Sequence, residues 1–575
     1  MTSFRIERLN LRDGQLTTWS LLDPRHSNWP VVYTLDGRDE IYVGESLNAT
    51  ARMRQHLDTA AKARLTTARV VIDETFNKSA CLDLESFLIR LLAGDGKYEV
   101  LNRNEGITNA NYFGREDYRK TFDAIFDELR EQGIFTRTVR QIQNTDLFKL
   151  SPFKALTPDQ AGAIEDILNG LFDDLEAGVG SRIVIRGDPG TGKTVVAIFL
   201  MKLLSDIRTA DTTVPPDTDS ILSEFFVPGY PELLAGFRFG LVVPQQSLRR
   251  SIQKVFRKTP GLDESMVLTP FQVGESREKF DLLIVDEAHR LNQRANQPSG
   301  VQNKKFADIN HRLFGRDEPG LTQLDWITTQ SNHQIFLLDA AQRVRPADVP
   351  VAALDSLVRP ADEQHRMYVL TSQMRVQAGA DYVGYIRALL TGCAPAPQEF
   401  PGYDLRFFDD FAAMQRALRR REQQDGLARL LAGYAWPWRS KRDPSAHDIE
   451  IAGVRLQWNR SAVDWVSSAT SVDEVGSIHT IQGYDLNYAG VIIGNDLRFD
   501  SRNGGLVFNR SSYFDKKGTE NNRILGISYD DSDLLQFVTN IYAVLLTRGI
   551  RGTYIYVCDP ALRDHLRPLF PQPID

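Results

Sequence analysis

Cysteine is scarce in this chain of 575 residues, which has only Cys81, Cys393 and Cys558. So few, widely separated cysteines argue against a disulfide framework and against a cysteine-rich zinc site, and they fit a reducing compartment. Long apolar runs are missing too. No stretch approaches the length that spans a membrane, and the first residues, MTSFRIERLN, lack the apolar segment of a secretory signal. These absences predict a cytoplasmic protein that does not associate with membranes.

An excess of positive charge is also absent, since the formal net charge is -7. This value argues against a uniformly basic coat for nucleic acid, although it allows a local basic groove. Internal repeats and long low-complexity tracts are missing as well. The chain is too long for one hydrophobic core, so we expect about two to four domains.

Apolar and polar residues alternate in patterns that divide the chain. Residues 1–114 combine a hairpin, helices and a strand, which predicts a small α+β domain. Helical spacing of apolar residues, ending near Gly133, predicts a connector over 115–150. From there on short apolar strands alternate with helices, which predicts an α/β fold with parallel sheets covered by helices. The further domains are expected at 151–360 and 361–575, with insertions at 209–220, 290–330 and 400–470.

The segment IVIRGDPGTGKTVVAIFLMKLL contains the pattern G-x-x-x-x-G-K-[ST] between an apolar strand and an amphipathic helix. Its glycines let backbone N–H groups approach phosphate oxygens, and the helix N-terminus adds partial positive charge. Lys193 can reach the β- and γ-phosphates of ATP, and Thr194 can bind Mg²⁺. The alternative is a glycine turn before a helix. The expected ATP-binding residues of this loop are Gly187, Asp188, Pro189, Gly190, Thr191, Gly192, Lys193 and Thr194.

A second motif, FDLLIVDEAHRL, places Asp286 and Glu287 at the end of an apolar strand. Two adjacent carboxylates at the end of a buried strand are costly unless they meet a cation. Asp286 is expected to hold Mg²⁺ through water, and Glu287 to activate the attacking water. The alternative is an ordinary strand end with solvated acids.

These two motifs and several later ones resemble those of the superfamily 1 helicases, which have two RecA-like domains. Within them the chain is similar to the Schlafen-type bacterial ATPases, from about Phe153 to the end. The resemblance implies that Gln160 in LTPDQAGAI contacts adenine. It also implies that Asp339 and Gln342 in LLDAAQRVRP sense the γ-phosphate, although Leu338-Asp339 stands where the family usually has Gly-Asp.

The same resemblance implies two arginine fingers, Arg375 in LTSQMR and Arg548 in IYAVLLTRG. Cations supplied across an interdomain cleft can raise a phosphoryl-transfer rate by ~10³–10⁵. The alternative for each is a surface arginine. The segment SIHTIQGYDLNYAGVIIG resembles the motif that couples the second domain to nucleic acid and nucleotide, through Thr480, Gln482, Gly483 and Asp485.

Two basic segments are candidates for binding single-stranded nucleic acid. PQQSLRRSIQKVFRK carries a cluster of cations between residues 249 and 258, and GYAWPWRSKRD places Trp436 and Trp438 beside further cations. Cations for phosphates and aromatic rings for bases are the features of single-strand binding sites. The alternatives are a solvated helix face and tryptophans that pack in a core.

The stretch VVYTLDGRDEIYVGES resembles the signature of the GIY-YIG nuclease family, with Val31-Val32 in place of Gly-Ile. The likeness continues along the N-terminal domain in the order and approximate spacing that the family shows. The matching residues are Tyr33, Tyr42, Arg52, His56, Glu85 and Asn102.

Each of these groups suits phosphodiester hydrolysis. Glu85 would hold a divalent metal, Mg²⁺ or alternatively Mn²⁺, and Arg52 would neutralise developing negative charge. Either Tyr33 or Tyr42 could deprotonate water, with His56 sharing or relaying the proton. The alternatives are a hairpin with two packing tyrosines, or a degenerate nuclease that binds without cutting.

The leading hypothesis is therefore an ATP-dependent nucleic-acid motor fused to a metal-dependent endonuclease, with DNA favoured over RNA. The resemblance suggests a context in defence against invading DNA or in repair. One rival is a nucleotide-switched sensor of nucleic acid or protein, whose N-terminal domain only docks. A second rival is a motor without nuclease activity.

Overall fold

The computed structural model describes residues 4–570 apart from 12–14, 58–63, 103–110, 213–221, 296, 298, 340–341, 379–380, 394, 462–464 and 482. The chain divides into two compact units. Unit 1 comprises Met1–Leu168, Ile198–Gly236 and Ser251–Met266, and unit 2 comprises Asn169–Ala197, Phe237–Arg250 and Val267–Asp575. Among the helices in the described ranges, none is both long and apolar enough to cross a bilayer.

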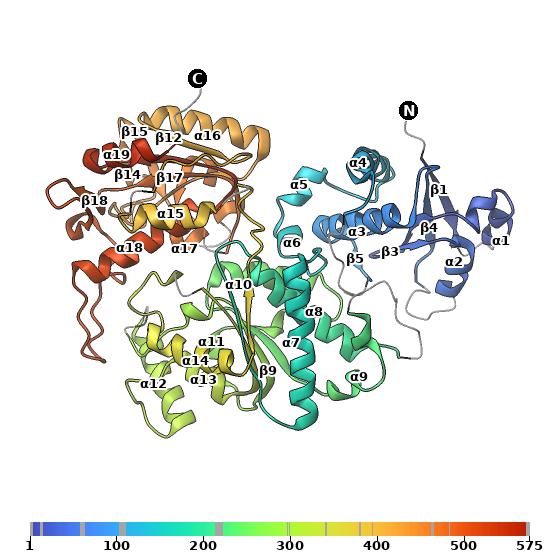
Figure 1. The fold of residues 1–575 in the computed structure, drawn as a ribbon, viewed down its shortest axis with the longest axis horizontal. Helices are drawn as coiled ribbons and strands as arrows, with labels where there is room; N and C mark the ends of the chain where they lie inside the picture. Colours follow the sequence, from blue (N-terminus) through green and yellow to red (C-terminus); the bar gives the residue numbers. More distant parts are fainter. Residues whose placement is uncertain are drawn as a thin grey trace. The chain divides into compact units, whose positions relative to one another are not determined.

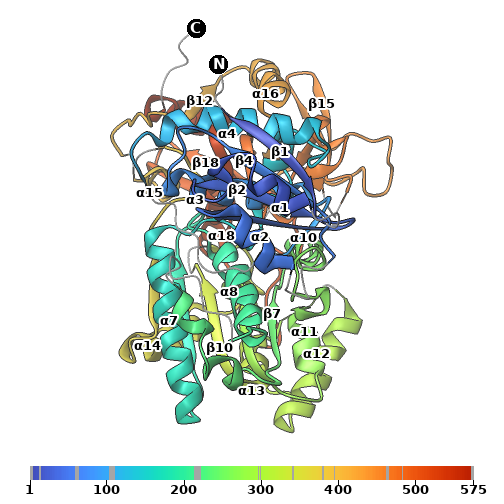
Figure 2. The ribbon, with the colours of Figure 1, turned by 90° about the vertical axis from the view of Figure 1, so that its right-hand side faces the viewer.

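Unit 1 begins with a mainly antiparallel five-stranded sheet, in which β1, β4 and β2 run side by side (Figure 2). The strand order is β1-β4-β2-β3-β5, and the short pairing of β3 with β5 is parallel. Together with its helices, this sheet gives the N-terminal part an α+β arrangement. Its strands are β1 (Arg5–Asn10), β2 (Val31–Asp36), β3 (Glu40–Ser46), β4 (Thr67–Ile72) and β5 (Glu99–Val100).

The central strand β2 is buried along its whole length because helices cover both faces of the sheet. Alternate side chains separate into two cores: Val32 packs with α3 on one face, and Tyr33 packs with α1 and α2 on the other. Asn77 caps α3 by accepting from the Ala80 N–H, and Gly96 ends the helix in the left-handed conformation. The helices are α1 (Gln15–Ser20), α2 (Ala49–Leu57) and α3 (Lys78–Asp95).

The predicted connector helix is α4 (Arg115–Glu131), and it stops just before Gly133, whose φ is 80°. Its apolar stripe includes Phe122 and Phe126, which join the same core as α3. The segment expected as a linker over 115–150 is therefore part of the N-terminal core, because α3 presents apolar residues to these helices as well as to the sheet. Further helices of unit 1 are α5 (Val139–Gln143), α6 (Asp146–Lys149) and α9 (Tyr230–Leu233).

Unit 2 contains a six-stranded parallel sheet in the order β11-β6-β10-β9-β7-β8, which is the centre of a first α/β lobe. Its apolar strands confirm the parallel α/β architecture expected from the sequence. Figure 1 shows β9 with α11, α13 and α14 in the same part of the ribbon. The strands are β6 (Arg182–Gly187), β7 (Phe239–Val242), β8 (Val267–Leu268), β9 (Phe280–Val285), β10 (Ser331–Leu338) and β11 (Met367–Leu370).

The edge strand β11 corrects the expected boundary at residue 360. Leu370 of β11 pairs with Gly187 of β6, so the first α/β lobe extends at least to Leu370. Helices α7, α8 and α10 contain residues of both units, so the compact units do not follow the expected boundary at residue 150 either. These helices are α7 (Pro158–Ala177), α8 (Lys193–Arg208) and α10 (Gln246–Arg257).

Residues 290–330, expected as an insertion, form a small helical cluster around Phe306, Ile309 and Trp326. The Trp326 ring lies 4.3 Å from that of Phe306, centroid to centroid, and its Nε1 donates to Asn310 Oδ1 at 2.7 Å. The helices of this part of unit 2 are α11 (Pro270–Glu275), α12 (Gly300–Phe314), α13 (Gln323–Thr329) and α14 (Val351–Glu363).

The second α/β lobe has a seven-stranded sheet in the order β12-β20-β17-β13-β16-β15-β14, parallel except for the pair β14 and β15. The expectation of an insertion over 400–470 is wrong, because β12 to β15 belong to this sheet. The insertion expected at 209–220 lies mostly outside the described residues. The strands are β12 (Asp404–Phe408), β13 (Ala428–Ala432), β14 (Ile449–Ile451), β15 (Val454–Trp458), β16 (Glu474–Gly476), β17 (Leu486–Ile493) and β20 (Gly549–Val557).

Helices cover both faces of this second sheet (Figure 1). Helix α16 packs into the core on one face, and α15 and α18 pack into the core on the other. A separate hairpin is formed by β18 (Leu497–Asp500) and β19 (Gly505–Phe508). The helices of this lobe are α15 (Tyr382–Leu390), α16 (Phe411–Asp425), α17 (Ile478–Ile481), α18 (Asp531–Leu546) and α19 (Pro560–Leu566).

We predict that Trp326→Ala lowers the free energy of unfolding of the first α/β lobe by ~3–5 kcal/mol. The substitution opens a cavity beside Phe306 and removes the indole donor from the buried Asn310. The measurement is guanidinium denaturation followed by far-UV circular dichroism. Val301→Ala on α12 is the control: Val301 is 79% exposed, and its truncation should change stability by less than ~0.5 kcal/mol. A Trp326→Ala protein as stable as this control would contradict the packing described.

Candidate functional site

The glycine-rich loop joins β6 to α8 and turns through two glycines with left-handed backbone, Gly190 (φ 89°) and Gly192 (φ 81°). Glycine populates this region without the strain that a Cβ would bring. Lys193 reaches back over the loop, where its Nζ donates to the carbonyls of Gly187 (2.5 Å) and Asp188 (2.9 Å). The strand, loop and helix thus follow one another as the motif requires, with the lysine folded against the loop backbone.

Asp286 and Glu287 follow directly on the buried strand β9. Asp286 is fully buried, and its carboxylate accepts from the Thr194 hydroxyl at 2.7 Å and from the Glu287 N–H at 3.0 Å. Burial, and next the charge of Glu287, raise the pKa of Asp286 above its ordinary value. A hydroxyl and a carboxylate brought together at the end of the glycine-rich loop are oxygen ligands of the kind that Mg²⁺ prefers, so these two residues fit that ion.

Glu287 adopts a left-handed backbone (φ 51°), which is strained for a residue with a Cβ. Its Oε2 lies 3.1 Å from Nε2 of the buried His289. The Asp339 N–H donates to the other ring nitrogen of His289, Nδ1, at 3.2 Å, so the proton of the neutral ring belongs on Nε2, the nitrogen nearer to Glu287. Burial alone would raise the pKa of Glu287, but His289 and the cations Lys193 and Arg548 hold it below its ordinary value.

The residues expected to sense the γ-phosphate lie at the end of β10. Gln342 Nε2 donates to Asp339 Oδ2 at 2.9 Å, and Gln342 Oε1 is buried without a hydrogen bond from any described residue. Because His289 lies against both Asp339 and Glu287, it links the end of β10 to the end of β9. The sequence analysis did not single out His289. Its position two residues after Glu287, in the motif FDLLIVDEAHRL, was the signal that could have identified it.

The segment after β11 packs directly on the glycine-rich loop. The Met374 N–H donates to the Gly190 carbonyl and Gln373 Nε2 to the Pro189 carbonyl, each at 2.8 Å. A Cβ on Gly190 would lie only 2.8 Å from Cβ of Arg375. A residue larger than glycine would therefore clash at position 190, and Arg375 is held beside the loop.

Both arginines expected as fingers lie in this region. Arg375 Nε donates to Asp485, and its Nη1 is buried without a hydrogen-bond partner among the described residues. Arg548 is only 2% exposed, and its Nη1 donates to the Tyr484 carbonyl at 3.4 Å. Burial, and next the charge of Arg375, lower the pKa of Arg548 to about 9, so it remains charged at neutral pH. The charge of Arg548 also reaches Glu287, whose pKa it lowers.

The segment expected to couple the second lobe contains α17 and the turn after it. Thr480 is buried in α17. Gly483 has φ 87°, and a Cβ there would lie 2.8 Å from Cβ of Leu248 in α10. Asp485 is the partner of Arg375, so this segment is joined to the one that packs on the loop.

Two further residues were expected near the nucleotide or the nucleic acid. Gln482 lies outside the described residues. Gln160 belongs to unit 1, where it is fully buried and its Oε1 accepts from the Thr157 N–H at 3.1 Å. Contact of Gln160 with adenine therefore stays a prediction.

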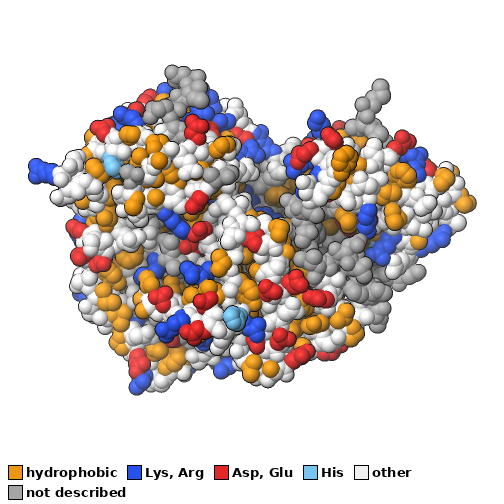
Figure 3. Space-filling model, in the orientation of Figure 1, with side chains coloured by type: hydrophobic (Ala, Val, Ile, Leu, Met, Phe, Trp, Pro, Cys, Tyr) orange, Lys and Arg blue, Asp and Glu red, His pale blue; other side chains and the backbone are white. Residues whose placement is uncertain are grey.

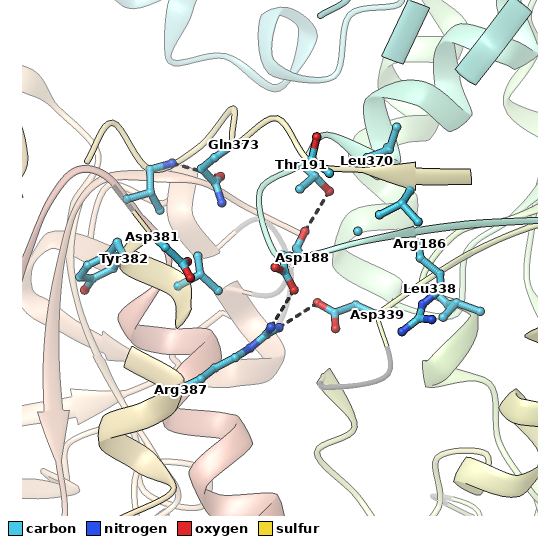
Figure 4. Close-up of a pocket in the computed structure, with 15 residues that line it drawn as sticks. Arg186, Asp188, Thr191, Leu338, Asp339, Leu370, Gln373, Asp381, Tyr382 and Arg387 are labelled. Carbon is cyan, nitrogen blue, oxygen red and sulfur yellow. Dashed lines mark hydrogen bonds and ion pairs between the residues drawn. The ribbon is translucent and has the colours of Figure 1, made fainter. Parts of the chain in front are cut away.

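A cavity of about 920 Å³ opens beside the glycine-rich loop. Figure 4 shows Arg387 of α15 reaching between Asp188 and Asp339, with Asp381 and Tyr382 at the start of the same helix. The sequence analysis did not single out Arg387, because this residue lies in an amphipathic helix that contains no recognisable motif.

The two expected nucleic-acid surfaces are partly occupied by contacts within the protein. Arg249 donates to the carbonyl of the residue that follows β7, at 3.0 Å, and Arg257 pairs with Glu264. Trp436 and Trp438 are half-buried against the core that contains α16. Figure 3 shows positive and negative side chains interspersed over the face in view, in keeping with the net charge of -7.

In the N-terminal domain, Tyr33, Tyr42 and His56 form a ring cluster with centroids 4.9 to 6.3 Å apart. The Tyr33 hydroxyl and His56 Nε2 are hydrogen-bonded at 2.7 Å. A Cβ on Gly44 would clash with the Tyr33 hydroxyl, so glycine is needed opposite this ring. Strands β2 and β3 and helix α2 thus bring together three of the expected groups.

Charged groups surround these phenols. Burial, and next the Tyr42 phenol, raise the pKa of Tyr33 well above its usual value, while Arg52 opposes the increase. Burial would lower the pKa of Arg52, but Tyr33 and Tyr42 raise it. The half-buried Glu85 on α3 also raises the pKa of Tyr33, which places it within electrostatic reach. Within the described part of the chain, no group of three or more His, Cys, Asp or Glu side chains is arranged to hold a metal ion.

Asn102 has a different environment from the other residues of this set. Its Oδ1 accepts from the Val43 N–H at 3.1 Å, and its Nδ2 donates to the Val43 carbonyl at 2.8 Å. Both amide atoms thus hold the middle of β3, the strand that carries Tyr42. The geometry gives Asn102 a positioning role for that strand.

Several known proteins resemble this chain. A Saccharomyces cerevisiae protein, Uncharacterized protein YPL245W, is 27% identical over 421 residues, which cover 67% of this chain and 84% of that protein. Among solved structures, the Pif1 helicase from Candida albicans is 13% identical with a TM-score of 0.21, and the likeness covers 47% of this chain and 55% of that one. The Pif1 helicase from Bacteroides in complex with ADP-AlF3 and ssDNA is 10% identical with a TM-score of 0.25, covering 68% and 91%.

TM-scores of 0.21 and 0.25 are too low to support a shared architecture, so the family of this chain is assigned from its sequence match to a family model. The family model described as Schlafen group 3, DNA/RNA helicase domain, matches residues 181–559. This range includes the glycine-rich loop, the carboxylates Asp286 and Glu287 and both candidate arginine fingers. Because the match covers more than half of the chain, the chain belongs to the Schlafen group 3 DNA/RNA helicase domain family.

Proposed function

We propose that the chain is a nucleic-acid motor, a helicase or translocase that hydrolyses ATP at the glycine-rich loop and acts on DNA in preference to RNA. The observation that carries this proposal is the 2.7 Å hydrogen bond from Thr194 to Asp286. This hydrogen bond holds the end of the glycine-rich loop beside the buried carboxylate that follows β9. A nucleotide with a bound cation requires phosphate-binding and cation-binding groups in this proximity. Membership of the helicase-domain family supports the same function.

The residues of the loop would bind the nucleotide. Lys193 would exchange its contacts with loop carbonyls for the β- and γ-phosphates, and the backbone N–H groups near Gly190 and Gly192 would bind phosphate oxygens. Thr194 and Asp286 would hold Mg²⁺, which when bound neutralises phosphate charge and orients the phosphates. The raised pKa of Asp286 expresses the cost of a buried carboxylate, a cost that a cation there would remove.

Glu287 would take the proton from the attacking water. The cations that lower its pKa favour the ionised form, which is the form that accepts a proton. His289 Nε2 lies 3.1 Å from the same carboxylate and would fix its orientation. Arg375 and Arg548 would meet the charge that develops on the γ-phosphate.

We further propose that the N-terminal domain is a metal-dependent endonuclease, and that the fusion acts in defence against invading DNA or in repair. The specific observation in favour is the hydrogen bond between Tyr33 and His56 beside Tyr42, with Arg52 and Glu85 in electrostatic reach. Glu85 would hold the divalent ion, which when bound activates the scissile phosphate. Arg52 would stabilise negative charge on the phosphate.

The two phenols differ in a way that bears on the identity of the base. Tyr33 is fully buried but has His56 to accept its proton, whereas Tyr42 is half-buried and faces the rings of both. To act as the base, a phenol must first pass its own proton to an acceptor and must also reach water. Tyr33→Phe and Tyr42→Phe, tested separately, show which phenol is required for cleavage.

For the ATPase, we predict that Lys193→Ala abolishes hydrolysis because the phosphates lose their cation. Glu287→Gln should still bind ATP but hydrolyse it at least ~10²-fold more slowly, because the water loses its base. Nucleotide binding and turnover are measured separately. Glu450→Gln, an exposed glutamate of the second lobe paired with Arg455, is the matched control and should behave as wild type. Hydrolysis by Glu287→Gln at the wild-type rate would refute its assigned role.

For the nuclease, we predict that Glu85→Ala and Arg52→Ala each eliminate cleavage while ATP hydrolysis stays near the wild-type rate. The loss of one donor to developing charge typically costs ~10²–10³ in rate. Cleavage of DNA and RNA is measured with Mg²⁺ or Mn²⁺, with and without ATP, for these variants and for Tyr33→Phe and Tyr42→Phe. Glu74→Ala is the control, since Glu74 is 72% exposed in the same domain. Cleavage that survives Glu85→Ala, or wild-type protein that cuts no substrate, would exclude this nuclease site.

A further inference from the structure

Arg387 joins the second lobe to two carboxylates of the first. Its Nη1 lies 2.7 Å from Asp188 Oδ1, and its Nη2 lies 3.5 Å from Asp339 Oδ2 (Figure 4). Asp188 is a residue of the glycine-rich loop itself, with its carbonyl 2.9 Å from Lys193 Nζ. Asp339 follows β10, the strand that pairs with β6. A single guanidinium therefore spans the loop and the neighbouring strand end.

These two carboxylates stand where a nucleotide would bring strong negative charge. ATP carries several negative charges on its phosphates, and like charges nearby weaken its binding. Asp339 is nearly buried, with 5% of its side chain exposed, so water screens it poorly, whereas Asp188 is 57% exposed. Without a cation between them, both would repel the phosphate chain.

We propose that Arg387 is a charge-compensating positioning residue for nucleotide binding, which offsets Asp188 and Asp339 so that the loop accepts a polyanion. This inference rests on the proposed ATPase function and goes beyond the two arginine fingers. Arg387 needs no contact with ATP for this role, because its effect is transmitted through the two carboxylates. This role depends on the positive charge of Arg387. The alternative is a mechanical tie, in which Arg387 only holds the two lobes together through its hydrogen bond to Asp188.

The charge model predicts a pattern of changes in affinity that a mechanical tie does not. Arg387→Gln should weaken binding of MgATP about 10-fold, equivalent to ~1.4 kcal/mol. Arg387→Lys, which keeps the charge, should stay near wild type. Asp188→Asn keeps the backbone N–H that belongs to the loop and removes only the repelling carboxylate, so it should bind at least as tightly as wild type. The double variant Arg387→Gln with Asp188→Asn should recover most of the lost affinity.

The experiment is titration of each full-length variant with a fluorescent ATP analogue and Mg²⁺, with thermal unfolding as a check that each variant folds. Arg406→Gln is the matched control: Arg406 is an ion-paired arginine of the same lobe, with 37% of its side chain exposed against 32% for Arg387. It should bind as wild type.

Three results would overturn the inference while leaving the ATPase proposal intact. One is wild-type affinity in Arg387→Gln. Another is a loss in Arg387→Lys as large as that in Arg387→Gln. The third is weakened binding in Asp188→Asn with no recovery in the double variant, which would identify a mechanical tie. Failure of the proposed function looks different: wild type would bind no ATP analogue, or Lys193→Ala would bind it equally well, and both proposals would then fall.

Discussion

The hydrogen bond from Thr194 to the fully buried Asp286 is the constraint on which the arrangement of the first lobe depends. A carboxylate without solvent needs donors, and the described residues provide the Thr194 hydroxyl and the Glu287 N–H. The residue that provides the N–H, Glu287, has a left-handed backbone. Its own carboxylate lies beside His289. The Asp286 carboxylate thus joins the end of the loop to the end of β9, and His289, through Glu287, joins the end of β9 to the end of β10.

The second lobe is connected to the glycine-rich loop by backbone hydrogen bonds and by an ion pair. Gln373 and Met374 bond to the carbonyls of the glycine-rich loop, so a change in loop conformation must move the segment that carries Arg375. Arg375 in turn is paired with Asp485, just after the turn at Gly483. In a motor that converts nucleotide state into movement, these are the contacts through which the loop would act on the second sheet.

The sequence predicts the parallel strands and the glycine-rich loop well, because uninterrupted apolar runs such as that of β9 leave few alternatives. It fails where sheet strands are short or polar. Strands β12 to β15 contain residues such as Asp404 and Arg455 beside apolar positions, and the charged helix α16 lies among them in the chain, so the region resembled an insertion. Contacts between distant segments are also hidden: no local pattern indicates that Arg387 meets Asp188.

If the chain is a nucleic-acid motor, its rate of ATP hydrolysis must respond to nucleic acid. ATP hydrolysis at saturating MgATP is measured with and without single-stranded DNA or RNA, at low and at moderate salt. We expect a faster rate with nucleic acid, and a gain that fades as salt rises because phosphate contacts depend on counterion release. A rate indifferent to every nucleic acid tested, at either salt concentration, would contradict the motor and favour a nucleotide-switched sensor of protein.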